Sequence, residues 1–138
     1  MDSSQIRREW LPIAAIAFLA ANLLHGADHL RQGVDGVDVA VKVGGAMLTV
    51  AAVVVFRKRT DPIAPLLATI VGFTAAILVA ASHIAPHWSL LSDSYVDDVH
   101  PDALSWAVML LEVVAASLLG VLGALALRTQ VALTEVHQ

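Results

Sequence analysis

Cysteine is absent from this 138-residue sequence. Its absence excludes disulfides, thiolate metal sites and cysteine nucleophiles, so any metal ion must be held by nitrogen and oxygen ligands. Charged residues are also scarce, at 14% of the chain, and the formal net charge is only -4. The few Lys and Arg residues form no broad patch of the kind that neutralises phosphates, so we expect no nucleic-acid partner.

Apolar residues dominate what remains. They make up 58% of the chain, and the mean hydropathy is +0.76. These values are too high for a soluble domain, so we expect lipid as the surrounding solvent. A membrane span needs about 20 mostly apolar residues in a helix, which satisfies its own backbone hydrogen bonds. Four stretches meet that requirement: residues 11–30, 37–56, 63–84 and 103–127.

The sequence therefore predicts an all-α integral membrane protein with a single four-helix transmembrane domain over residues 1–138 and an outer loop at 85–102. Most of the eight basic residues fall on one side of these spans, and by the positive-inside rule that side is cytoplasmic. Both termini are then cytoplasmic and the loop faces outward. The small, alanine-rich chain is typical of bacterial inner-membrane proteins, so we expect the protein in that cell membrane. Membrane lipids and either a homo-oligomer or a larger membrane complex are the expected partners.

The outward end of the first span carries two histidines and an aspartate. His25 and His29 are four residues apart and Asp28 is three residues after His25. Residues at these spacings share one face of a helix. That face offers two imidazoles and a carboxylate to a single cation, and the partial negative charge of a helix C-terminus favours the cation further.

Two further groups of candidate ligands belong to the same side of the membrane. His83 and His87 repeat the four-residue spacing at the end of the third span, although Pro86 disturbs the backbone between them and makes His83 the better candidate. Asp93 and His100 follow in the outer loop. Ionisable groups that converge on one end of membrane segments are usually functional, so we predict a metal site built from these residues and the first span.

Imidazole and carboxylate ligands suit several transition metals. Zinc is the first prediction, because a shell of three nitrogens, or of two nitrogens and one oxygen, with an open position is its usual catalytic arrangement. Copper and iron are the alternatives. Metal-bound imidazoles normally donate their second N–H to a carboxylate or carbonyl, and several aspartates of the outer side are available for that purpose.

Glu112 is the most deeply placed ionisable residue of the predicted bundle. It lies about ten residues into the fourth span, which is roughly 15 Å at 1.5 Å per residue, and Asn22 has a comparable depth in the first span. A carboxyl group at that depth must be neutral or find a partner. One interpretation is a hydrogen bond to Asn22, and the other is a role in proton transfer or substrate binding. Together with Asp28, Glu112 is our candidate catalytic group.

Some of these residues also have purely structural interpretations. Interfacial histidines can simply anchor helix ends, and loop aspartates can be solvated or cap the following helices, as for Asp35, Asp38, Asp97, Asp98 and Asp102. The fourth span also carries a row of small residues that permits close helix packing, either between copies of the chain or inside the bundle. That row is Ala116, Gly120 and Ala124.

Three functional hypotheses remain open from the sequence. The first is a metalloenzyme that acts on a lipid-like substrate at the outer leaflet, although no HExxH motif is present. The second is metal binding without chemistry, as a carrier or sensor, with a haem carrier as a variant in which histidines are axial ligands. The third is a metal-free accessory or assembly subunit. We favour metal binding over any named reaction.

Overall fold

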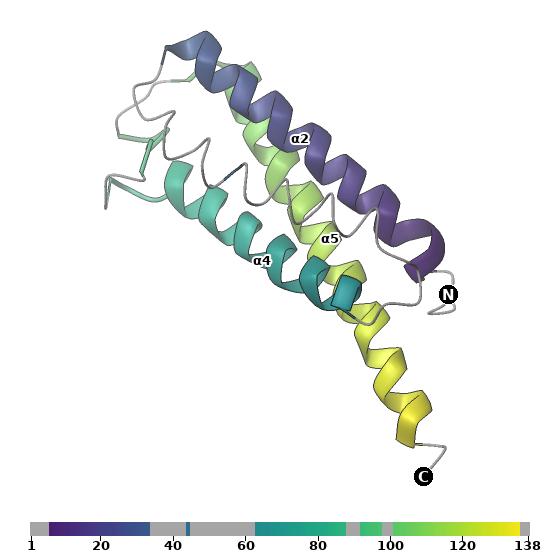
Figure 1. Cartoon of the computed structure of the whole chain (residues 1–138). Helices are drawn as coiled ribbons and strands as arrows, with labels where there is room; N and C mark the ends of the chain where they lie inside the picture. The colour runs from purple at the N-terminus through teal and green to yellow at the C-terminus, as the bar shows by residue number, and fades with distance from the viewer. Residues whose placement is uncertain (1–5, 34–43, 45–62, 88–91, 98–100, 136–138) are drawn as a thin grey trace.

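The computed structural model describes residues 6–33, 44, 63–87, 92–97 and 101–135, and the regular elements within them are all helical (Figure 1). A short π-helical turn, η1, leads into the first long helix, and the described part of the chain contains no strand. This confirms the predicted all-α class for that part. The elements are η1 (Ile6–Trp10), α2 (Leu11–Gln32), α4 (Ile63–His83) and α5 (Ala103–Glu135).

Three of the four predicted spans are helices long and apolar enough to cross a membrane. They are Leu11–Gln32, Ile63–His83 and, within α5, Ala103–Arg128, of 22, 21 and 26 residues. At 1.5 Å per residue the shortest is about 32 Å long, which matches a hydrocarbon core of about 30 Å. The predicted span at 37–56 lies outside the described residues, except for Gly44, which is helical.

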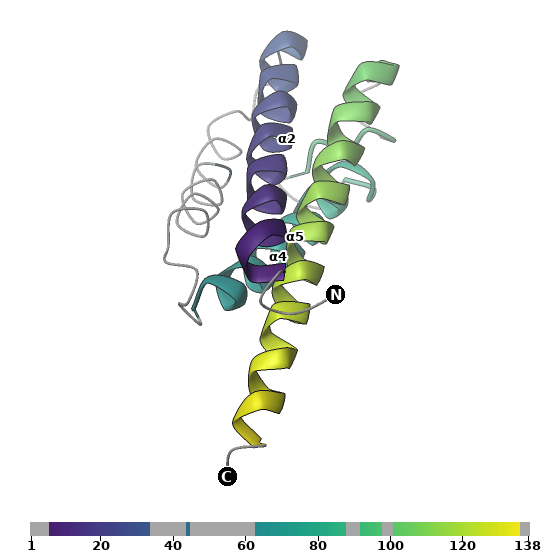
Figure 2. The ribbon, with the colours of Figure 1, turned by 90° about the vertical axis from the view of Figure 1, so that its right-hand side faces the viewer.

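The long helices form a bundle in which α5 is the shared partner. Helices α2 and α4 run in the same direction, and α5 returns between them and packs extensively against both, whereas α2 and α4 touch each other little (Figures 1 and 2). The C-terminal part of α5 projects beyond the other helices (Figure 1). The C-terminal ends of α2 and α4 therefore meet the N-terminal end of α5 at one end of the bundle.

Small residues bring α4 and α5 into close contact. A Cβ atom added at Gly72 would collide with the backbone of Gly120 and Ala116, and one added at Gly123 would lie 2.6 Å from the Thr69 backbone nitrogen. Backbones this close exclude any larger side chain. Ala116 and Gly120 of the small-residue row thus pack inside the bundle.

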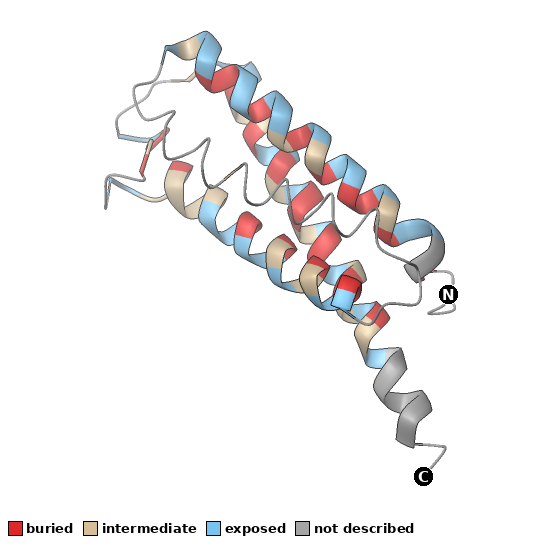
Figure 3. Cartoon of the chain, in the orientation of Figure 1, coloured by how far each residue is buried: buried red, intermediate tan, exposed pale blue. Residues whose placement is uncertain are grey.

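The faces that point away from the bundle are apolar and exposed (Figure 3). Leu23 is 61% exposed and Ile77 is 67% exposed, and similar residues recur along all three helices. Monomeric soluble proteins rarely expose continuous apolar surface on this scale, whereas lipid would cover it at no cost. Other members of this surface are Ile13, Ile16, Leu24, Ile70, Leu111, Val114 and Leu118.

Local signals end α2 and begin α5 at the site end of the bundle. Gly33, with φ of 66°, takes the left-handed conformation that closes α2. Asp102 precedes α5, and its carboxylate accepts the backbone N–H of Ser105 at 3.0 Å, which confirms its prediction as an N-cap. Arg31 of α2 also donates to Asp102 at 3.0 Å, so the two helix ends are held together.

Candidate metal centre

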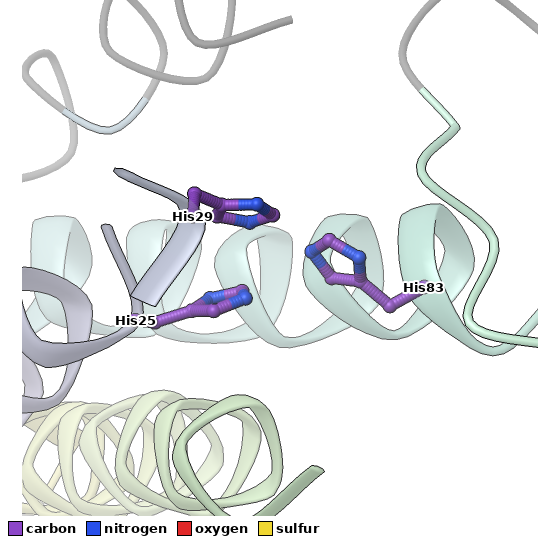
Figure 4. A group of neighbouring side chains, drawn as sticks. All are labelled: His25, His29 and His83. Atoms are coloured by element: carbon purple, nitrogen blue, oxygen red, sulfur yellow. The ribbon is translucent and has the colours of Figure 1, made fainter. Parts of the chain in front are cut away.

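Three buried histidines meet at the end of the bundle where α2 and α4 end and α5 begins. Each of His25, His29 and His83 offers a ring nitrogen, and these atoms all lie within 4.8 Å of one another. Their rings point toward a common centre, two from α2 and one from the end of α4 (Figure 4). They are 5%, 7% and 5% exposed. Three imidazoles gathered out of water provide a ligand set that could hold one transition metal ion.

The helices explain how the three rings come together. His25 and His29 are one turn apart on α2, which places their ring centroids 4.6 Å apart. His83 is the last residue of α4, and because α4 runs parallel to α2, its ring reaches the same level. Its centroid lies 4.8 Å from that of His25 and 5.2 Å from that of His29.

Glu112 of α5 contacts the Nδ1 nitrogen of the His25 ring. Its Oε2 lies 2.5 Å from Nδ1 of His25, and its Oε1 accepts a hydrogen bond from the Asn22 amide at 2.6 Å. The carboxyl group is only 1% exposed, so these two contacts provide its solvation. A carboxylate on Nδ1 favours the tautomer with the proton there, which leaves the lone pair of Nε2 for a metal ion.

The His83 ring is oriented by the segment that follows α4. Its Nδ1–H donates to the backbone carbonyl of Asp93 at 3.1 Å, while its own carbonyl accepts the backbone N–H of Tyr95 at 2.8 Å. A carbonyl on Nδ1 has the same consequence as the carboxylate on His25, because Nε2 is again the unprotonated nitrogen. Two of the three imidazoles therefore have, on Nδ1, the hydrogen-bond acceptor that metal-bound histidines usually have on their second ring nitrogen.

Tyr95 completes the buried end of the cluster, and sequence reasoning missed it. Its ring centroid lies 4.6 Å from that of His83, with the two rings tilted by 41°, and its hydroxyl lies 3.5 Å from Nε2 of His25. Burial raises the pKa of Tyr95 to about 12, although a hydrogen bond with the Gln32 side chain lowers it. The sequence shows only a tyrosine near a predicted span end, where interfacial aromatics are common.

Asp28 belongs to a neighbouring polar network. Its carboxylate oxygens accept hydrogen bonds from Arg31 at 2.7 Å and Gln32 at 2.6 Å. Both of these side chains continue to the Ser105 hydroxyl, at 3.0 Å and 2.9 Å. This network joins the end of α2 to the start of α5 beside the histidines. The hydrogen bonds found for the Asp28 carboxylate belong to this network and not to the histidine cluster.

The other predicted ligands are placed differently. His87 is exposed, and its backbone N–H donates to the Asp97 carboxylate at 3.1 Å. Asp93 contributes its backbone carbonyl rather than its carboxylate to the cluster. His100 lies outside the described residues. Of the six predicted metal ligands, the structure thus gathers His25, His29 and His83 into one group.

Comparison with known proteins adds no relative to this picture. No family model, no curated protein and no solved structure matches the chain. Any function must therefore be argued from the residues of the site itself.

Proposed function

We propose that this protein is an integral membrane protein that binds one transition metal ion through His25, His29 and His83. The observation that carries the proposal is the convergence of the three ring nitrogens within 4.8 Å. Metal–nitrogen bonds of about 2.0 to 2.1 Å place neighbouring nitrogens of a tetrahedral complex about 3.3 Å apart. When the rings rotate about their side-chain bonds, the nitrogens can approach from at most 4.8 Å to this distance.

The surroundings of the rings support an ion rather than an incidental group of histidines. Partners on Nδ1 of His25 and His83 leave Nε2 of each ring to coordinate, and the Glu112 carboxylate supplies negative charge next to the cation. Zinc is the first candidate, and copper and iron are the alternatives, because all three accept imidazole ligands. Axial haem ligation is less suitable, since it needs two imidazoles on opposite faces of a macrocycle rather than three around one point.

The proposal for the membrane has four parts: four spanning helices, cytoplasmic termini, an outward-facing metal site and a bacterial inner membrane. The spans and their orientation rest on the described helices, on the apolar stretch at 37–56 and on the distribution of Lys and Arg. The bacterial membrane rests only on the small, alanine-rich composition of the chain. A reporter that is active only outside the cytoplasm should be inactive when fused after Gln138. Activity of that fusion would contradict the orientation.

The role we propose is capture of a metal ion at the outer side of the membrane and its retention there. Glu112 then acts by orienting His25, and Asp28 by holding α2 against α5. The bundle is narrow, so we propose that it works as a homo-oligomer or within a larger membrane complex surrounded by lipid. Catalysis on a lipid-like substrate would need a group that acts on that substrate as well as the ion.

Metal content tests the proposal. The full chain is purified in detergent, supplied with zinc, freed of excess metal and analysed by mass spectrometry for metals. We expect about one equivalent of zinc in the natural protein and almost none in a variant with His25→Ala, His29→Ala and His83→Ala. The matched control is His87→Ala, which removes an exposed histidine from outside the cluster.

The outcomes separate metal binding from the metal-free hypothesis. Loss of zinc from the triple variant, with helical circular dichroism and the zinc content of the control both unchanged, supports the three-histidine site. Equal zinc in the triple variant contradicts it. No bound metal in the natural protein after separate exposure to zinc, copper and iron would leave the accessory or assembly role as the better explanation.

A further inference from the structure

Tyr95 is held against the histidine cluster by a backbone hydrogen bond and by ring contacts. The residue is 4% exposed, and its backbone N–H donates to the His83 carbonyl at 2.8 Å. One side of its ring packs on His83 at 4.6 Å, and Trp106 of α5 lies edge-on at 5.3 Å. Backbone and ring contacts from two helices therefore determine where the phenolic oxygen lies.

That oxygen lies at a distance from His25 that two ligands of the same metal ion would have from each other. Its distance to Nε2 of His25 is 3.5 Å. In a tetrahedral zinc complex, neighbouring ligand atoms are about 3.3 Å apart. Because Nδ1 of His25 is engaged by Glu112, Nε2 is the atom that coordinates. The phenolic oxygen and this nitrogen thus already have the separation of two neighbouring corners of the complex.

We propose that the Tyr95 oxygen is the fourth ligand of the metal ion held by His25, His29 and His83. The inference rests on the proposed metal site. When the bond forms, the metal–oxygen bond replaces the phenolic O–H bond, the proton passes to the solvent, and no electron changes hands. A four-coordinate site of three imidazoles and one phenolate is closed, which is the arrangement of sites that retain a metal rather than activate water on it.

A hydrogen bond from Tyr95 to a metal-bound water is the main alternative, and the geometry favours it less. Such a hydroxyl would lie one hydrogen bond, about 2.7 Å, beyond a water that itself occupies the fourth corner. In that arrangement the hydroxyl lies about 3.7 to 5.7 Å from the His25 nitrogen, depending on the direction of the hydrogen bond, so only the shortest of these distances approaches the observed one. The observed 3.5 Å is close to the corner-to-corner distance of two ligands.

Copper(II) is the probe that distinguishes a phenolate ligand. Detergent-purified full-length protein is loaded with copper(II) alone and examined by visible absorption, resonance Raman and electron paramagnetic resonance. Tyr95→Phe removes the hydroxyl but keeps the ring on His83, and His87→Ala is the control, because it changes an exposed histidine outside the cluster and keeps the hydroxyl. Zinc affinity is measured in parallel by competition with a chromophoric chelator.

We expect a phenolate-to-copper charge-transfer band and phenolate vibrations in the natural protein and in His87→Ala. Both signals should disappear in Tyr95→Phe, whereas hyperfine coupling to imidazole nitrogen remains. Azide should then bind to copper in Tyr95→Phe, whose fourth position is open, and not in the natural protein. Zinc affinity should fall roughly tenfold or more in Tyr95→Phe, since even the loss of a group that only hydrogen-bonds to a metal ligand typically costs 10- to 100-fold.

Two results would overturn the inference in different ways. Copper bound by imidazole nitrogen without any phenolate signal in the natural protein, or equal zinc affinity in Tyr95→Phe, would exclude Tyr95 as a ligand and leave the three-histidine site in place. Failure of the natural protein to bind either copper or zinc would reject the metal site itself, and with it the fourth ligand.

Discussion

Replacement of Glu112 by glutamine tests the link between the buried carboxylate and the metal site. In the natural protein one carboxylate oxygen lies 2.5 Å from Nδ1 of His25 and the other accepts from Asn22 at 2.6 Å. Glu112→Gln keeps the size of the side chain but replaces one acceptor oxygen with an NH₂ donor. It also removes the negative charge that favours a proton on Nδ1.

Both orientations of the new amide weaken metal binding. If its NH₂ faces His25, the ring must move its proton to Nε2, which is the nitrogen that the metal needs. If its oxygen faces His25 and Asn22 rotates to accept the NH₂, the tautomer is retained but the carboxylate charge is lost. Loss of a group that hydrogen-bonds to a metal ligand costs roughly 10- to 100-fold in metal affinity, or about 1.4 to 2.7 kcal/mol.

Zinc affinity and zinc-dependent stability give two measurements of this effect. Competition with a chromophoric chelator measures the affinity, and thermal unfolding followed by circular dichroism measures the stabilisation by saturating zinc, which should fall by the same free energy. Ser117→Ala is the matched control. The Ser117 hydroxyl is also on α5, and the hydrogen bond found for it, at 2.7 Å, goes to the Val113 carbonyl of the same helix and not to the site. Unchanged zinc affinity in a folded Glu112→Gln variant would refute the role assigned to Glu112.

Two further predictions concern the fold around the site. Gly72→Ala should lower the free energy of unfolding in detergent by about 1 to 3 kcal/mol or more, because the added Cβ collides with the backbone of Gly120. Gly26→Ala is the control and should not lower it, because a Cβ at Gly26 meets nothing within 4 Å. Equal unfolding temperatures of the two variants would contradict the close contact of α4 and α5. The pKa of Asp102 is lowered, first by the Ser105 backbone N–H and then by Arg31, so its charge stabilises the fold above the ordinary pKa of 3.8 and this contribution disappears as the pH falls through the lowered value. Asp102→Asn should therefore unfold at a lower temperature than the natural protein at pH 7 and at the same temperature at strongly acidic pH, and a difference that persists in acid would count against the charge.

Local patterns were sufficient for a large part of the fold and of the site. The apolar stretches predict the three described spans because the length of a membrane helix is set by the bilayer. The four-residue spacing of His25 and His29 predicts their shared face because helix geometry alone determines it. Equal depth in two spans was also enough to pair Asn22 with Glu112, and the structure confirms that hydrogen bond.

Contacts that depend on packing between distant segments were not predictable in this way. The bond between His25 and Glu112 joins residues 87 positions apart, and it depends on the rotation of α5 against α2. The place of Tyr95 depends on how the segment after α4 folds back onto His83. Loop conformation carries no periodic signal, so the hydrogen bond from His83 to the Asp93 carbonyl was not predictable either.

X-ray absorption at the zinc edge detects whether three imidazoles surround one metal ion, without any change to the protein. Zinc-loaded protein should show a first shell at about 2.0 to 2.1 Å together with the outer-shell scattering of about three imidazole rings. The His87→Ala variant should give the same spectrum. A first shell of oxygen atoms without imidazole scattering, or no zinc retained by the folded protein, would contradict the account.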